Sequence, residues 1–80
     1  MNLQTDDSLL FRIFPNPSSD FIYIQTELDS FDLQIVDISG KEIINQKNQS
    51  KIDIRKLEKG TYFIKVSSET KLGTSIFIKK

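Results

Sequence analysis

The sequence predicts an all-β domain, a seven-stranded antiparallel sandwich of the immunoglobulin type. Three observations indicate this class. Apolar and polar residues alternate with the period of two that is typical of β-strands. Turn-forming residues recur about every 8 to 12 residues. No stretch spaces its apolar residues as an amphipathic helix does. A small closed barrel is the second choice, and a parallel α/β fold would need crossover helices that the sequence does not offer.

The predicted strands lie between these turns. They are residues 8–14, 21–26, 32–38, 41–47, 50–55, 61–68 and 74–80. In the second strand, Ile22 and Ile24 share one face while Phe21 and Tyr23 share the other. The third strand loses its alternation from Val36 onward, which predicts a β-bulge or the onset of a turn.

The connection between the first two strands reads "FPNPSSD". Pro15 fixes its φ near −65°, lacks an N–H donor and pushes Phe14 toward an extended conformation. Pro17 does the same to Asn16. The side chains of Ser18–Asp20 can bond back to the backbone as a turn. We therefore expect a rigid connector that aims one strand relative to the other and blunts an exposed sheet edge.

Later connections also carry turn residues. The segment "SGKE" at 39–42 supplies a turn between strands. In "KLEKG" at 56–60, we expect Leu57 to point inward and Gly60 to adopt a positive φ. The segment "ETKLG" at 69–73 is expected to turn the chain before the final strand.

The start of the chain differs from the rest. Residues 1–8 have little to bury, which predicts a linker remnant or a disordered tail before a domain at 9–80. The first residues lack the basic and apolar regions of a signal peptide. No run approaches the roughly 20 apolar residues of a membrane-spanning helix.

Composition argues against several function classes. The 80 residues include 11 Lys+Arg and 11 Asp+Glu, and a net charge of zero argues against nucleic-acid binding. The absence of Cys and His removes disulfides, thiolate metal sites and the commonest general base. No nucleophilic-serine or phosphate-loop motif occurs. We predict no catalytic residues, no metal and no cofactor.

Two weaker binding signals remain. Asp29 and Asp32 could join backbone carbonyls around Ca²⁺, although the usual ligand loop is missing and turn capping is the favoured interpretation. Phe21, Tyr23 and Phe63 could form a sugar-stacking platform if all three point outward on one face. Packing in the core or at a strand edge is the favoured alternative for these rings.

Four blocks of the sequence, in order, resemble the type A C-terminal sorting domain of the type IX secretion system of Bacteroidota. They are "FPNPSSDFIYI", "LQIVDISGKEI", "IDIRKLEKGTYFIKV" and the final "FIKK", and the resemblance spans residues 10–80. They match an aromatic-Pro-Asn-Pro element, an apolar-x-apolar-x-Asp-x-x-Gly-Lys hairpin and a Leu-x-x-Gly-x-Tyr element. One position departs, because Ile76 stands where the family often has lysine.

The resemblance implies a non-catalytic secretion signal that directs a larger cargo protein through the outer membrane, after which the domain is cleaved or anchored at the cell surface. It implies an immunoglobulin-like fold and passage through the periplasm to the outer-membrane surface or the exterior. The implied partners are the outer-membrane translocon, shuttle and sortase-like proteins, and an N-terminal cargo domain of the same chain. Met1 then begins only a segment of that protein, and its signal peptide belongs to the preceding part. Neither nucleic acid nor membrane insertion is expected.

Residues that match the family motifs are expected to build the fold. They are Phe14, Pro15, Asn16, Pro17, Asp20, Asp37, Gly40, Lys41, Leu57, Gly60 and Tyr62. The residues that we expect the translocon to recognise are Ile76, Phe77, Ile78, Lys79 and Lys80. By position this strand lies at a sheet edge, where free backbone groups can accept a partner strand, and its terminal lysines, Lys79 and Lys80, are expected to be solvated. The two other function classes are an immunoglobulin- or fibronectin-like spacer and a small carbohydrate-binding module.

Overall fold

The computed structural model describes residues 11–80 of the chain, and within this range it contains strands, turns and loops but no helix. The strands are β1 (Phe11–Phe14), β2 (Phe21–Thr26), β3 (Asp32–Asp37), β4 (Glu42–Lys47), β5 (Lys51–Asp53), β6 (Gly60–Ser67) and β7 (Leu72–Lys79). The predicted all-β class and the seven strands are therefore confirmed.

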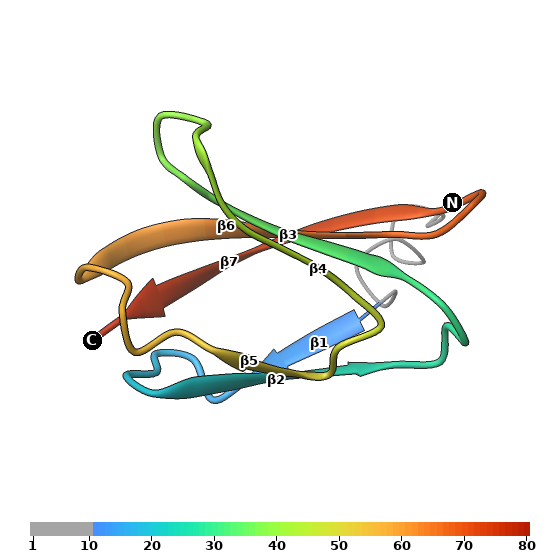
Figure 1. Ribbon diagram of the computed structural model, residues 1–80. Helices are drawn as coiled ribbons and strands as arrows, with labels where there is room; N and C mark the ends of the chain where they lie inside the picture. The colour runs from blue at the N-terminus through green and yellow to red at the C-terminus, as the bar shows by residue number, and fades with distance from the viewer. Residues whose placement is uncertain (1–10) are drawn as a thin grey trace, which may run out of the picture.

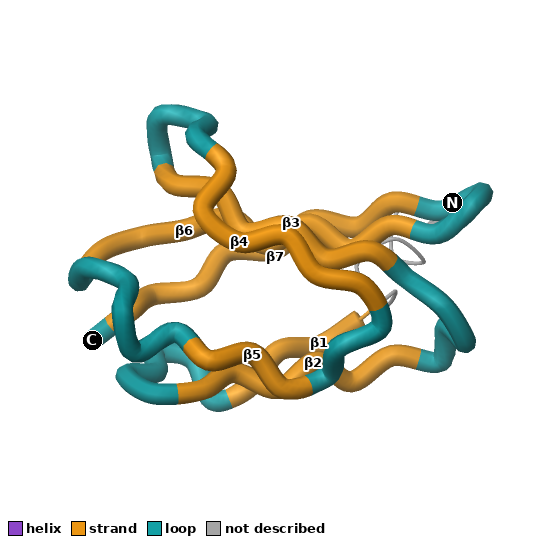
Figure 2. Tube along the Cα trace, viewed as in Figure 1, coloured by secondary structure: helices purple, strands orange, loops and turns teal. Residues whose placement is uncertain are grey.

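Two antiparallel sheets face each other in a sandwich (Figures 1 and 2). The smaller sheet has the order β1-β2-β5 and the larger has the order β4-β3-β6-β7. The turn between β3 and β4 projects away from the sandwich in Figure 1, whereas the end of β7 lies beside the connections that follow β1 and β5. β7 is an edge strand, as predicted.

The core is formed by the inward face of each strand. Ile22 of β2, Ile35 of β3 and Ile64 of β6 are completely buried, and Phe77 of β7 is the largest side chain that is fully enclosed. Burial of a large aliphatic or aromatic side chain contributes about 1.5–3 kcal/mol relative to exposure, so these alternating positions hold the two sheets together. Leu57 packs against the cluster from its turn, as predicted.

A bulge or the onset of a turn was expected in the third strand, and a bulge is present at this place, but its extra residue lies in β4 rather than in β3. Ile35 pairs with Ile44 of β4, but Val36 pairs with Glu42, so the register shifts between these two residues of β3. Both Ile35 and Val36 are buried. Ile43 of β4 is the residue without a partner in β3, whereas β3 keeps a regular register with β6 from Asp32 to Asp37, so its consecutive residues still point to opposite faces.

The boundaries of two strands differ from the prediction by two residues, and the other differences within residues 11–80 are of one residue. β7 begins at Leu72 rather than at 74, and Gly73 lies in the β6–β7 ladder opposite Val66 rather than in the turn. The turn is short because the N–H of Ser68 donates to the carbonyl of Lys71 at 2.8 Å, which lets the ladder begin at once.

β5 ends at Asp53, whereas the prediction extended this strand to residue 55. The side chain of Asp53 accepts from the backbone N–H of Arg55 and so turns the chain. The N–H of Ile54 then donates to the carbonyl of Asp20 at 2.9 Å, which ties this turn to the β1–β2 connector. Residues 8–10 of the predicted first strand, the predicted tail at 1–8 and the start of the domain at residue 9 lie outside the described residues.

Candidate functional site

The connector between β1 and β2 lies against the end of β7. The side-chain amide of Asn16 donates to the carbonyl of Ile76 at 3.0 Å, and its oxygen accepts from the N–H of Ile78, also at 3.0 Å. One asparagine side chain thus bonds to the outer edge of β7 as a neighbouring strand would. The peptide bonds before Pro15 and Pro17 are both cis.

Ser18 continues this contact through its backbone. Its N–H donates to the carbonyl of Ile78 at 3.0 Å, and its carbonyl accepts from the N–H of Lys80 at 2.8 Å. The two residues Ser18 and Lys79 form a parallel β-bridge. The hydroxyl of Ser18 is turned back to the carbonyl of Phe21 at 2.6 Å, so the buried serine fixes the connector to β2 as well.

These contacts correct one prediction about the final strand. We expected the outward backbone groups of an edge strand to be free, but Asn16 and Ser18 already bond to those groups between Ile76 and Lys80. The connector covers a sheet edge, as predicted. That edge belongs to β7, whose outward backbone groups were expected to be free. We call Asn16 and Ser18, with the four hydrogen bonds they make to β7 and Lys80, the edge clamp.

The side chains of β7 divide between the core and the surface. Phe77 is 0% exposed and its ring stacks on that of Tyr62 with centroids 5.4 Å apart, whereas Ile76 and Ile78 are 51% and 46% exposed. Lys79 is also buried, and its ammonium group donates to the carbonyl of Lys80 at 3.3 Å. The burial of Phe77 and Lys79 anchors this strand in the fold, and the expectation that the chain ends in two solvated lysines is wrong for Lys79. It holds for Lys80, which is exposed.

The Leu-x-x-Gly-x-Tyr motif forms the corner that leads into β6. The hydroxyl of Tyr62 donates to the carbonyl of Glu58 at 2.7 Å, four residues upstream, while the ring packs on Phe77. Gly60 has a φ of +148°, which confirms the predicted positive value. Desolvation raises the pKa of the Tyr62 hydroxyl, and the nearby carboxylate of Glu58 adds to this effect, so the group remains a neutral donor.

The Asp-x-x-Gly-Lys motif forms the turn between β3 and β4. One carboxylate oxygen of Asp37 accepts from the hydroxyl and the N–H of Ser39 and from the N–H of Lys41, at 2.6, 2.9 and 3.0 Å. Gly40 has a φ of +92°. The hydrogen bond from the hydroxyl of Ser39, followed by that from the backbone of Lys41, lowers the pKa of Asp37, because both bonds favour the charged carboxylate.

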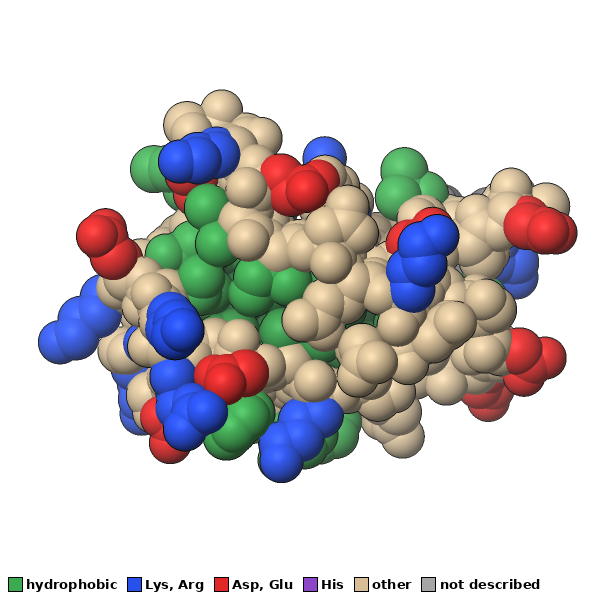
Figure 3. Space-filling model, in the orientation of Figure 1, with side chains coloured by type: hydrophobic (Ala, Val, Ile, Leu, Met, Phe, Trp, Pro, Cys, Tyr) green, Lys and Arg blue, Asp and Glu red, His purple; other side chains and the backbone are tan. Residues whose placement is uncertain are grey.

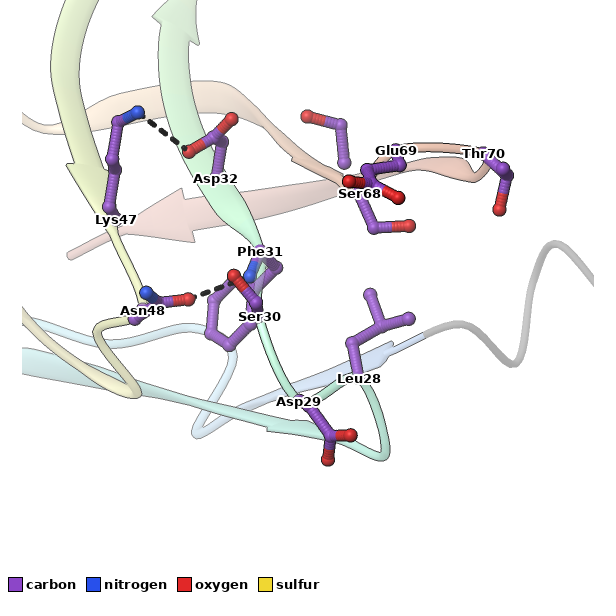
Figure 4. Close-up of a pocket in the computed structure, with 11 residues that line it drawn as sticks. Leu28, Asp29, Ser30, Phe31, Asp32, Lys47, Asn48, Ser68, Glu69 and Thr70 are labelled. Carbon is purple, nitrogen blue, oxygen red and sulfur yellow. Dashed lines mark hydrogen bonds and ion pairs between the residues drawn. The ribbon is translucent and has the colours of Figure 1, made fainter.

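A polar depression of about 630 Å³ opens at the other end of the sandwich (Figure 4). Asp29 and Asp32 line it but point away from each other, and Asp32 faces Lys47 at 3.8 Å. The side chain of Asn48 accepts from the N–H of Phe31. Among residues 11–80 no group of three or more potential metal-ligating side chains is present. The geometry therefore does not assemble the calcium site that was considered for these two aspartates.

The three rings considered for sugar stacking do not share a face. Phe21 and Tyr23 belong to the three-stranded sheet, whereas Phe63 belongs to the four-stranded sheet. Tyr23 instead stacks on Phe14 with centroids 5.8 Å apart, and cations cover the ring of Phe21, with Lys51 at 4.5 Å from its centroid. Ring faces that are already occupied are poorly placed to stack on a sugar.

Apolar and charged groups are separated on the face seen in Figure 3. Hydrophobic side chains gather near its middle, and lysine, arginine and acidic side chains lie around its margin. In the part of the chain that the structure describes, no helix is long and apolar enough to span a membrane.

Residues 12–80 match the family described as the secretion system C-terminal sorting domain. This chain belongs to that family. The match covers most of the sequence and includes each of the three motifs whose geometry is described above. No curated protein matches the chain. The sorting domain is a signal for type IX secretion, so the function of this chain is to mark a protein for export through the outer membrane by the type IX machinery.

Sequence reasoning missed the role of Asn16. The two prolines drew attention to stiffness, but the residue between them makes the contacts to β7. A polar side chain with one donor and one acceptor group, held between two residues that lack N–H donors, was the available signal. No local pattern indicates which distant strand this side chain contacts.

Proposed function

We propose that this sorting domain is recognised through the end of β7, and that it acts as a non-catalytic address for a cargo domain that precedes it. Ile76, Ile78 and Lys80 are the exposed residues of this segment, and Phe77 and Lys79 anchor it in the fold. The observation that carries this proposal is the exposure of two isoleucines on a strand that is otherwise fixed on both sides.

The partners proposed for this segment are the outer-membrane translocon and the shuttle and sortase-like proteins of the type IX system. On this route the domain passes through the periplasm to the outer-membrane surface or the exterior, where it is cleaved or anchored. The family membership supports the route, because a sorting domain acts on a protein that is exported.

We also propose that the sandwich is of the immunoglobulin type and spans residues 9–80, with residues 1–8 acting as a linker. Two observations support the fold. β3, β6 and β7 share a sheet while β1, β2 and β5 form the other, and Tyr62 bonds back across the corner between β5 and β6. A tyrosine at this corner is a hallmark of immunoglobulin-like sandwiches.

The motif residues outside β7 are proposed to act through the fold rather than by contacting the translocon. Asn16 bonds to β7, Asp37 holds its own turn, and Tyr62 supports Phe77. Two further motif residues, Asp20 and Leu57, bond through their backbones to Ile54. Each of these contacts explains a motif residue without a bound ligand.

The test is export of a folded reporter fused in front of residues 1–80 in a type IX-competent cell. We expect the reporter in the medium or on the surface, and retained in the periplasm of a matched strain without the translocon. Periplasmic retention in both strains would mean that the domain is a spacer. Release that does not depend on the translocon, together with binding of the purified domain to a glycan array, would favour a carbohydrate-binding module.

A further inference from the structure

Both edges of β7 are hydrogen-bonded near the end of the strand. One edge pairs with β6 along its whole length, from Leu72 opposite Ser67 to Lys79 opposite Gly60. The other edge carries the edge clamp from Ile76 to Lys80. The carbonyl of Ile76, both backbone groups of Ile78 and the N–H of Lys80 are therefore already bonded and are not open to strand addition.

The side chains of the same segment remain accessible. Ile76 and Ile78 alternate with buried residues, so both project from the outer face of the four-stranded sheet. Ile76 lies opposite Phe63 of β6, which is half-buried, and Ile78 lies opposite Thr61. The result is a small apolar group on a rigid surface, and we call Phe63, Ile76 and Ile78 the apolar triplet.

The charged residues that flank the apolar triplet along β6 and just after β7 are of one sign. Lys65 occupies the next outward position of β6 and is exposed, and Lys80 is exposed just after β7. No acidic residue occupies an outward position of β6 or β7. A complementary surface would therefore be apolar at its centre and acidic at its rim.

We propose that the type IX machinery recognises the outward side chains of β7 and β6 that form the apolar triplet, while the hydrogen bonds of the edge clamp remain intact. This inference rests on the proposed function and adds the mode of recognition to it. The partner is a protein that presents an apolar pocket for Ile76 and Ile78 with acidic groups near Lys65 and Lys80. The edge clamp keeps β7 in the position and orientation that the pocket needs, and the partner does not replace it with a strand of its own.

The first test locks the edge clamp with a disulfide. Ser18→Cys and Lys79→Cys place thiols on two buried residues that pair in a parallel bridge, and the natural chain has no cysteine that could compete. The bond forms in the oxidising periplasm and is verified by alkylation of free thiols. The two single variants are the controls.

We expect the locked reporter fusion to be exported as efficiently as the single variants, because recognition from the face needs no opening. Export that is lost only in the oxidised double variant would overturn the proposal, since it would mean that the edge must open. In either case the export of the unsubstituted fusion reports separately on the proposed function.

The second test changes the face. Ile76→Thr with Ile78→Thr keeps the β-branched shape but removes the apolar contact, and Leu72→Thr is the control because Leu72 is 61% exposed on the same face, away from the edge clamp. We expect at least a tenfold loss of export for the double variant, as is found for residues at the centre of an interface, and little change for Leu72→Thr. The double variant is placed in the disulfide-locked chain so that the domain stays folded. The melting temperature of the purified domain checks this. Unchanged export of the folded double variant would overturn the proposal.

The third test addresses the acidic rim. Lys65→Glu reverses a charge beside the apolar triplet, and Lys71→Glu reverses one in the turn before β7. We expect export to fall severalfold for the first and to stay near the original level for the second. Equal export of the two variants would contradict an acidic rim at this place.

Discussion

Two turns of this domain use a short polar side chain to bond the backbone, and they do so over very different distances along the chain. Asp37 bonds to residues two and four positions ahead of it, within the turn between β3 and β4. Asn16 bonds to residues 60 and 62 positions ahead, across to β7. The first turn is complete once its own hairpin exists, whereas the second needs the whole sandwich.

This difference in range separates the roles of the two motifs, the one that contains Asp37 and the one that contains Asn16. A turn that satisfies itself sets the shape of a hairpin, and its loss is felt locally. A turn that bonds to a distant strand sets the position of that strand, so its loss changes the structure at that strand. Breaking each turn in isolation should therefore change different parts of the molecule.

The largest effect is expected from removing the partner of the edge clamp. Deletion of Phe77–Lys80 should abolish cooperative folding, because loss of a buried Phe side chain alone costs about 3–5 kcal/mol, and an 80-residue domain has roughly 4–12 kcal/mol in total. Thermal unfolding followed by circular dichroism tests this. Phe77→Leu is the control and should still fold. A sharp unfolding transition in the deleted chain would show that β7 is peripheral after all.

The next effect concerns Gly60 of β6, which pairs with Lys79 at the end of β7. Gly60→Val should destabilise by about 1–3 kcal/mol, because a β-branched residue resists the φ of +148° although no atom lies near its side-chain position. Lys59→Ala, its exposed neighbour, should cost little. Chemical denaturation of both variants measures the difference, and equal midpoints would show that the backbone conformation at Gly60 carries no strain.

A smaller effect should come from Asn16→Ala, which removes both side-chain bonds to β7. We expect a loss of about 1–2 kcal/mol and faster hydrogen exchange at the N–H of Ile78, while exchange at the N–H of Gly40 stays slow. The control is Asn45→Ala, since the side chain of Asn45 bonds to Glu42, three residues away. Unchanged exchange at Ile78 would remove the contrast between the two turns.

The smallest effect belongs to the local turn and depends on pH. The folded-state pKa of Asp37 is lowered, so its contribution to stability is present above the unfolded pKa of about 3.9 and is lost as the pH falls through the lower folded value. Asp37→Asn should flatten this part of the acid unfolding curve. The amide resonances of Ser39 and Lys41 should follow the titration, whereas that of Ile78 should not. A shift of all three together would mean that the turn is coupled to β7.

Most of the fold could be read from the sequence because period-two alternation survives wherever one face of a strand is buried. The positive φ of Gly60 and the inward Leu57 followed from local patterns and were found, and the bulge expected near Val36 is present with its extra residue in β4. The start of β7 was misplaced by two residues, because Gly73 suggests a turn while the ladder with β6 already includes it.

The candidate site could be located but not interpreted. The sequence indicated the last strand and the Pro-Asn-Pro connector as separate features, and it could not show that they touch, since that contact joins residues some 60 positions apart. For the same reason Lys79 was expected to be solvated, yet it is covered by the connector it pairs with. Local patterns report which face is apolar, whereas edge contacts depend on how the two sheets meet.

The burial of Phe77 also has a consequence for timing. This residue follows in chain order nearly everything that it packs against, including Tyr62, so the core remains open during synthesis until β7 has been made. Until then, neither the exposed isoleucines nor the connector that holds them is in its final place. Under the proposed mode of recognition, a chain that ends upstream of β7 has no surface for the machinery to bind, so only a chain synthesised to its last strand is exported.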